Sequence, residues 1–455
     1  MPDKVVNTKV PQSVVRMIVA SALMGFAGIM SETSMNVTFP KLSKIFGVSM
    51  ESLAWVTTIY LLMVAIMMTL SAYFRRRFSE RSLFLSSVVI FVFGTLIGGT
   101  AVNFEILLVG RILQGIAAGI ALPLTFNIIL DRVPMSKLGT WMGFGSLVVS
   151  IAPSIGPTYG GLLVDSLGWR SIFFIILILV IISLFMGITS FEKSEPKDKS
   201  AKLDILQFIL LAIALTTSLI VVSELETGKL NVPTLIVFCI SLSLFIWKSL
   251  TSKIEFLNIR LFAKPAFLLA IIPFTLYQFA NIGGNYLIPS YLQIGFGVSS
   301  LLAGLSLLPG SLISALLNPW FGKIYDSKGA KLPLYVGNII LTVSLIFMYV
   351  FSHSLGMLLL TLIYIVFSFG RVMAFGNIQT SAVAHLSKED GPHALALFQM
   401  MNQYGGSIGT AVVALISSQY SNIKDSFQMM NLLFIVFGLL SFVFFKLMFR
   451  TKAYR

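Results

Sequence analysis

The sequence predicts an all-α membrane protein with fourteen transmembrane helices. Hydrophobic residues make up 56% of the 455 positions and charged residues only 11%, and the mean hydropathy is +0.92. These values lie far from the balance of a soluble globular domain. Cys239, which lies in an apolar run, is the single cysteine of the sequence, so an intrachain disulfide is excluded.

Fourteen apolar runs have about 20 residues, the length that a helix needs to cross roughly 30 Å of hydrocarbon. We expect spans at 16–39, 53–73, 82–102, 105–130, 139–163, 171–190, 203–223, 231–250, 266–288, 300–321, 332–351, 355–376, 394–419 and 428–448. The thirteenth is the most polar because it carries Gln399, Asn402 and Gln403. The first run has no small-residue cleavage site after it, so we interpret it as a retained helix.

The basic residues indicate the orientation of these spans. If the N-terminus is cytoplasmic, 25 of the 32 lysines and arginines fall in cytoplasmic segments. Five fall outside (Lys41, Lys44, Arg170, Lys229 and Lys424), and Arg111 and Arg371 lie within spans. This is the bias of the positive-inside rule, so both termini are expected in the cytoplasm. The net charge of +14 is then a topological signal and does not indicate a nucleic-acid partner.

A charged segment at 192–202 divides the chain after the sixth span. We expect a six-helix bundle at 1–191, an inserted helix pair with cytoplasmic linkers at 192–264, and a second six-helix bundle at 265–455. The loop at 72–79 and the loop at 322–329 occupy the same place in the two bundles. Duplicated halves are typical of secondary transporters, which bind substrate near the membrane midplane between the halves.

Glu32 is the one acidic residue deep within an apolar run, and this position makes proton transfer the first hypothesis. It lies about 12 Å below Pro40, and Arg111 lies about 9 Å below Glu105, so both could sit at the same depth. A nearby arginine favours a charged carboxylate, whereas burial favours the neutral acid. A rearrangement that changes their proximity would therefore load and release a proton. The alternative is a permanently paired structural salt bridge.

Other side chains would be costly facing lipid, and they are candidates for a substrate pocket. Aromatic faces and one acid in an apolar cavity suit lipophilic cations, although each residue could instead serve interhelical packing. The candidates are Asn36, Trp55, Tyr60, Asn127, Phe144, Tyr277, Gln278, Asn281, Asn285, Tyr286, Phe398, Asn402 and Gln403, together with Glu32. Arg371 lies about five residues from the predicted end of its span, which favours a snorkelling anchor over a substrate or proton-relay group.

The sequence offers no cofactor site. His353, His385 and His393 are separate and near span ends, so no metal site is expected. No glycine-rich loop of the Lys-Ser/Thr type is present, which disfavours ATP as the energy source and leaves the proton gradient. The spans also carry no paired carboxylates and no Ser/His/Asp set, so an enzyme is not expected.

Several stretches resemble one family. Arg111-Ile-Leu-Gln-Gly115 resembles the Arg-x-x-Gln-Gly motif of the major facilitator superfamily, and residues 152–161 with Gly168-Trp-Arg170 resemble its antiporter motif. Residues 32–37 with Pro40, and residues 402–409, resemble the first and thirteenth spans of the fourteen-span drug:proton antiporters, the family of QacA and SdrM. The resemblance covers essentially the whole chain.

This resemblance implies a major facilitator fold in which Glu32 and Arg111 couple protons. It assigns gating to Gly322, Asp326 and Gly329 in the loop after the tenth span. In the antiporter motif, Gly156, Pro157 and Gly160 allow close helix contact and a bend that could act as a gate, although simple small-residue packing is the alternative. Two departures are evident. Glu32 replaces the usual aspartate, and the loop at 72–79 is degraded, whereas its second copy at 322–329 is intact.

The expected function is therefore proton-coupled multidrug efflux of lipophilic, often cationic compounds by a monomer in the bacterial cytoplasmic membrane. A specific nutrient or metabolite transporter, either a symporter or an exporter, is the main alternative. A membrane protein that does not transport, such as a receptor or a lipid-modifying enzyme, is a further one.

Overall fold

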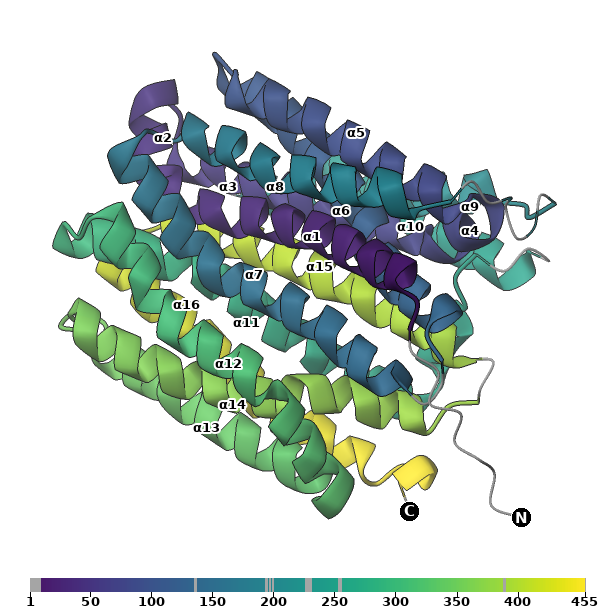
Figure 1. The fold of residues 1–455 in the computed structure, drawn as a ribbon. Coiled ribbons are helices and arrows are strands. Elements are labelled where there is room, and N and C mark those ends of the chain that lie inside the picture. The colour runs from purple at the N-terminus through teal and green to yellow at the C-terminus, as the bar shows by residue number, and fades with distance from the viewer. Residues whose placement is uncertain are drawn as a thin grey trace.

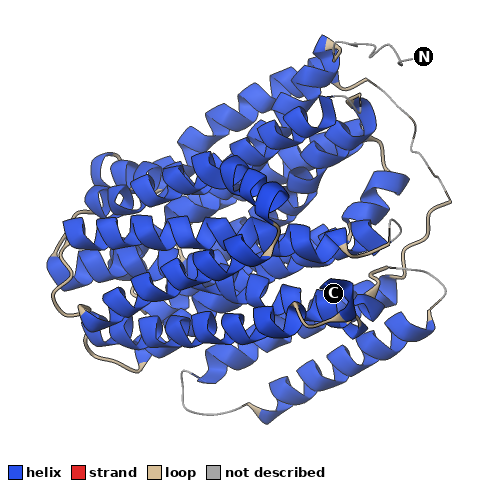
Figure 2. Ribbon diagram, turned by 90° about the horizontal axis from the view of Figure 1, so that it is seen from below, coloured by secondary structure: helices blue, strands red, loops and turns tan. Residues whose placement is uncertain are grey.

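The computed structural model describes residues 10–134, 137–192, 195, 198, 200–225, 231–252, 256–387 and 390–454. Basic residues that entered the topology prediction but lie outside the described residues are Lys4, Lys9, Lys193, Lys197, Lys199, Lys229, Lys253, Lys388 and Arg455. The described part of the chain folds into helices without strands (Figure 2). An all-helical fold is thus confirmed.

The first bundle begins with a long helix that is interrupted at η1. The elements of this bundle are α1 (Gln12–Met35), η1 (Asn36–Thr38), α2 (Phe39–Phe46), α3 (Met50–Thr69), α4 (Ser71–Arg77), α5 (Glu80–Gly99), α6 (Phe104–Arg132), α7 (Leu138–Ser166) and α8 (Arg170–Ser190). Side chains fix several starts: Ser49, Ser79 and Asn103 each accept a hydrogen bond from the amide three residues later. Such N-caps satisfy amides that the helix itself leaves unpaired.

The inserted pair and the second bundle follow. They contain α9 (Ile205–Glu224), α10 (Val232–Thr251), η4 (Ile259–Ala263), α11 (Pro265–Phe296), α12 (Ser300–Lys328), α13 (Lys331–Val350), α14 (Met357–Ala384), α15 (Asp390–Ser418), α16 (Ile423–Met448) and η5 (Lys452–Tyr454). The start of α1 and the end of α16 lie at the same end of the bundle (Figure 1). We call this end the termini side and the other end the opposite side.

Thirteen helices in the described residues are long and apolar enough to cross a membrane. They correspond to thirteen of the fourteen predicted spans. The remaining predicted span, 394–419, coincides with α15, which packs between α3 and α11. Asn402 and Gln403 of this helix are half-buried, whereas Gln399 is exposed.

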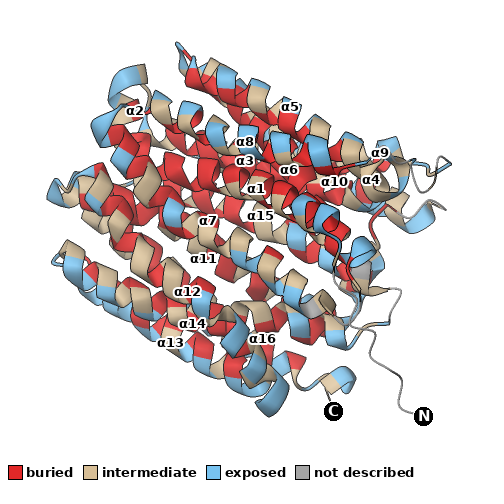
Figure 3. Cartoon of the chain, viewed as in Figure 1, coloured by how far each residue is buried: buried red, intermediate tan, exposed pale blue. Residues whose placement is uncertain are grey.

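The two bundles meet mainly through α7 on α12 and through α3 on α15, while α9 and α10 pack on each other beside α15. Buried residues concentrate in central helices such as α1 and α3 (Figure 3) and in α11, whereas α10 is mostly exposed. The domain boundaries at 191 and 264 remain a prediction.

One boundary differs from the prediction in a way that matters for function. The predicted span 355–376 is in fact part of a helix that continues to Ala384, so Arg371 lies thirteen residues before the helix end. The helix continues past its apolar part because Asn377 donates hydrogen bonds to the Phe321 and Met373 carbonyls. The predicted end at 376 is therefore wrong for the helix, and the snorkelling role of Arg371 remains a prediction.

Candidate functional site

Glu32 lies on α1 just before the helix changes its hydrogen-bonding pattern at Asn36. Pro40 has no N–H, so the Asn36 carbonyl lacks its usual donor four residues later, and a short 3₁₀ turn replaces the α-helix. The Asn36 side chain holds this turn to α3, because its Oδ1 accepts a hydrogen bond of 2.7 Å from Thr57.

The Glu32 side chain is only 5% exposed, and its Oε1 is buried without a hydrogen-bond partner. Burying a charged carboxylate without partners is costly, whereas burying the protonated acid costs far less. The position therefore makes the charge of Glu32 highly sensitive to any neighbouring group that arrives or leaves.

Arg111 of α6 is fully buried; its Nε and Nη1 have acceptors, and its Nη2 is buried without one. Its Nε donates to the Val56 carbonyl at 3.0 Å, and its Nη1 donates to Ser31 Oγ at 3.1 Å and to Gln114 Oε1 at 2.7 Å. The guanidinium also lies over the Tyr60 ring, with Cζ 4.4 Å from the centroid. These contacts hold the side chain in one position between α1, α3 and α6.

Glu32, Tyr60 and Arg111 form one buried cluster, which we call the Glu32 cluster. The Glu32 carboxyl interacts electrostatically with both other groups, and Tyr60 Oη is buried beside Gly28, one turn from Glu32. Within the described residues no ion pair of 4 Å or less joins Glu32 to Arg111. In this conformation the two residues are neighbours but do not form the permanent salt bridge that the sequence left open.

Three predicted pocket residues make packing contacts in this conformation, and their role in a pocket remains a prediction. Trp55 Nε1 donates to Ser223 of α9 at 3.1 Å, so this side chain faces the inserted pair. Tyr277 donates to Asn338 at 2.7 Å within the second bundle, and Phe398 is fully buried among phenylalanines. A sequence pattern gives the depth of such residues but not the side of the helix that faces the other bundle.

The remaining candidates lie on several helices. Tyr286 is buried against the first bundle, where its hydroxyl donates to the Met50 carbonyl at 3.4 Å. Gln278 and Asn285 are buried on α11, and Asn402 has a buried Oδ1 without a partner. The others are half-buried: Asn127 and Phe144 in the first bundle, and Asn281 and Gln403 in the second.

The antiporter-motif glycines lie where three helices converge on the opposite side. A Cβ at Gly156 would overlap Thr33 of α1, and one at Gly160 would overlap the Ser34 backbone. From the other bundle, Gly304 of α12 approaches the backbone of Pro157 just as closely. Only glycine allows backbones to approach to this extent.

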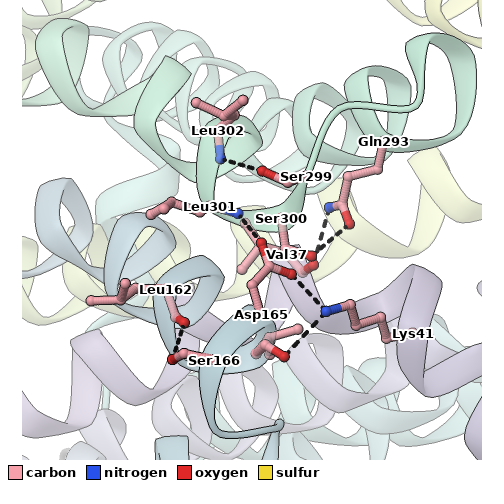
Figure 4. Close-up of polar contacts among 11 residues, drawn as sticks. Val37, Lys41, Leu162, Asp165, Ser166, Gln293, Ser299, Ser300, Leu301 and Leu302 are labelled. Atoms are coloured by element: carbon pink, nitrogen blue, oxygen red, sulfur yellow. Dashed lines mark hydrogen bonds and ion pairs between the residues drawn. The ribbon is translucent and has the colours of Figure 1, made fainter.

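Asp165, at the end of α7, connects the two bundles at this convergence (Figure 4). It accepts hydrogen bonds from the Leu301 amide at 2.8 Å and from Lys41 Nζ at 2.6 Å. The negative charge thus lies at the positive N-terminus of α12. Close by, Gln293 donates to the Val37 carbonyl at 3.0 Å. We call this set the opposite-side junction; the sequence reasoning missed Asp165 because acids at helix ends are common.

The two copies of the gating loop differ on the termini side. In the degraded copy, Arg75 pairs with Asp131, and nearby Arg132 pairs with Glu80 at 2.8 Å. In the intact copy, Gly329 has a φ of +75° where α12 ends, Asp326 is exposed, and a Cβ at Gly322 would meet nothing within 4 Å. The gating role of the intact copy remains a prediction.

Comparison with known proteins identifies the family. Residues 21–410 match the model of the Major Facilitator Superfamily. The chain belongs to this superfamily. Curated relatives of this major facilitator protein include the lincomycin resistance protein LmrB of Listeria monocytogenes, which is 33% identical and covers 88% of this chain and 86% of the relative. The multidrug resistance protein Stp of Mycobacterium tuberculosis is 26% identical, covering 87% of this chain and 74% of the relative. The riboflavin transporter RibZ of Clostridioides difficile is 24% identical, covering 89% of this chain and 88% of the relative.

Solved structures support the same fold. A POT family transporter, crystallised in complex with 5-aminolevulinic acid, matches with a TM-score of 0.71 at 16% identity, covering 98% of this chain and 97% of the transporter. The major facilitator fold is therefore confirmed. Among the described residues, His, Cys, Asp and Glu side chains do not gather in threes that could ligate a metal.

Proposed function

We propose that this major facilitator protein is a proton-coupled drug exporter that works by alternating access. The observation that carries the proposal is the Glu32 cluster, a buried, incompletely bonded carboxyl beside a fixed arginine. The names of LmrB and Stp support drugs as the exported compounds. No bound cofactor is needed, because the proton gradient supplies the energy.

The orientation follows from the positive-inside bias, which assigns the termini side to the cytoplasm of a bacterial cell. The opposite-side junction then closes the transporter toward the exterior, and lipophilic cations would enter from the cytoplasm or inner leaflet. A cation that reaches Glu32 favours its charged form and so competes with the proton for the same carboxyl. This competition is the exchange that antiport requires.

Specific export or uptake of a polar metabolite is the second candidate. It is supported by the RibZ relative and by the amide face of α11, where Gln278, Asn281 and Asn285 follow at helical spacing. Such amides suit a ligand that needs directed hydrogen bonds.

Ethidium export from a pump-depleted bacterial host tests the proposal. Glu32→Gln keeps the shape of the side chain but cannot release a proton, so energised efflux should fall to the background of empty-vector cells while surface expression persists. Glu32→Asp should retain part of the activity, because the ionisable group remains. Glu105→Gln makes the same chemical change at an exposed acid and should export like wild type.

Purified protein in weak buffer gives the direct measurement. Adding ethidium to wild type should release protons, and adding it to Glu32→Gln should not. Undiminished proton release and gradient-driven export by Glu32→Gln would exclude Glu32 as the coupling residue. Uptake of riboflavin without any ethidium export by wild type would favour the second candidate.

A further inference from the structure

Arg371 is a half-buried cation that the proton-coupling mechanism does not use. It lies fourteen residues after the first residue of α14 and thirteen before the last, close to the middle of the span. The face of α14 that carries the exposed Leu358, Leu362 and Val366 is on the other side of the helix. Arg371 therefore faces the protein interior, and its Nε is buried without a hydrogen-bond partner.

Contacts between α14 and the antiparallel α11 define what Arg371 faces. Tyr364 donates a hydrogen bond of 3.1 Å to Asn285 Oδ1, and Phe375 stacks on Phe274 with centroids 4.3 Å apart. Arg371 lies seven residues beyond Tyr364, and seven residues back from Asn285 on α11 is Gln278. This register puts Arg371 level with Gln278, one of the predicted pocket residues.

The guanidinium is oriented toward this part of α11. Side chains of an α-helix lean toward its N-terminus, and Arg371 interacts electrostatically with Tyr364, two turns earlier. Its Cζ is 5.7 Å from the Phe375 ring centroid on the other side. Tyr364 and Phe375 thus lie near the guanidinium, and Gln278 is level with it on α11. We call these four residues the Arg371 cluster.

The second bundle supplies no carboxylate for this charge. Its four acids are Asp326, Glu389, Asp390 and Asp425, and all lie outside the apolar spans. Among the described residues, no ion pair of 4 Å or less involves Arg371. A cation inside a membrane protein is costly unless a counter-charge compensates it, and such residues mark substrate pathways.

We propose that the Arg371 cluster binds a carboxylate of the transported compound. The planar guanidinium offers two parallel N–H donors that match a carboxylate, and the Gln278 amide can donate a further hydrogen bond. The protein then prefers amphoteric compounds, which place an amine toward Glu32 and an acid toward Arg371. This inference rests on the proposed drug export and specifies its substrate class.

Ciprofloxacin and its methyl ester test this inference, because they share the amine and differ in the free carboxylate. Their affinities for the purified full chain in detergent are measured by equilibrium dialysis. Wild type should bind the acid more tightly than the ester. Arg371→Met should lower this acid-to-ester affinity ratio at least tenfold, and Arg371→Lys, which keeps the charge but loses the planar fork, should lower it less. Lys446→Met removes an exposed cation of the same bundle and should leave the ratio unchanged.

Two results would overturn the inference. One is a wild type that binds the acid no better than the ester or does not bind it. The other is an Arg371→Met variant that weakens acid and ester alike, which would indicate that Arg371 serves packing or answers Glu32 across the bundles. Arg371→Lys keeps the test valid if Arg371→Met does not fold. Ethidium export separates the two proposals. A wild type that exports ethidium but binds the acid no better than the ester contradicts only this inference. A wild type that does not export ethidium contradicts the proposed function.

Discussion

The two arginines within the spans, Arg111 and Arg371, have different surroundings. Arg111 in the first bundle donates to a backbone carbonyl, a hydroxyl and an amide, and it stacks on Tyr60. Arg371 in the second bundle contacts mainly aromatic rings and has a buried Nε without an acceptor. Each guanidinium thus keeps one buried nitrogen without a partner, Nη2 in Arg111 and Nε in Arg371, but Arg111 is fixed by three hydrogen bonds.

The distribution of acids follows the same division. Glu32, the one deeply placed acid, lies beside the fixed arginine, and the apolar spans of the second bundle contain none. A fixed Arg111 gives Glu32 a constant electrostatic neighbour, so the proton can respond to what else arrives. An incompletely bonded Arg371 can instead exchange partners during transport. The comparison is consistent with the proposed proton site in one bundle and the proposed ligand site in the other.

The largest expected effect comes from substituting the two arginines in turn. Arg111→Met removes the hydrogen bonds that the guanidinium donates to Val56, Ser31 and Gln114, and a hydrogen bond to a charged group contributes about 1.5–3 kcal/mol. Arg371→Met removes a charge that has few partners, so it should change stability little or increase it. Thermal unfolding of the purified variants in detergent should therefore show a large decrease in Tm for Arg111→Met alone. Equal decreases would contradict the comparison.

Sequence reasoning predicted the helices better than the directions of their side chains. The all-helical fold and the approximate spans follow from hydropathy, because the membrane requires about 20 apolar residues for each helix. The end of α14 was missed because the Asn377 side chain donates a hydrogen bond to the Phe321 carbonyl of α12. Hydropathy does not detect such contacts between helices. Depth estimates placed Glu32 and Arg111 at one level, and the structure puts them in one cluster.

Rotation about the helix axis was beyond the sequence. Trp55 and Tyr277 looked like pocket residues because of their type, and only the packing shows that they bond to α9 and α13. Asp165 could have been noticed as the single acid after the antiporter motif, but its partner Leu301 is 136 residues away. The distance of Arg371 from the helix end was underestimated because the predicted span ended at 376, whereas α14 continues to Ala384.

A second, smaller effect should separate the two sides of α12. Gly304→Ala would push a methyl group into the Pro157 backbone, whereas a Cβ at Gly322 meets open space. Gly304→Ala should therefore weaken closure of the opposite-side junction and lower the ethidium export rate about tenfold, or 1.4 kcal/mol in the barrier. Gly322→Ala should stay within about twofold of wild type. A comparable loss in both variants would mean that the termini side closes tightly over Gly322 in another conformation.

The smallest expected effect concerns the charge at the opposite-side junction. Asp165→Asn keeps an acceptor for the Leu301 amide but removes the charge that attracts Lys41 and the N-terminus of α12. The Lys41 and Asp165 side chains are partly solvated, 44% and 26% exposed. The closed junction should therefore lose about 0.5–1 kcal/mol of stabilisation. That corresponds to a roughly twofold to fivefold shift away from the closed junction. Distances between spin labels on α7 and α12 would report this shift at low salt, and 1 M salt should reduce the difference between wild type and Asp165→Asn because it screens exposed charges.

Asp425→Asn is the matched control, since Asp425 pairs with His353 within the second bundle, and this substitution should leave the distances unchanged. A shift of equal size in both variants would show that general surface charge, and not the contact between bundles, sets this equilibrium.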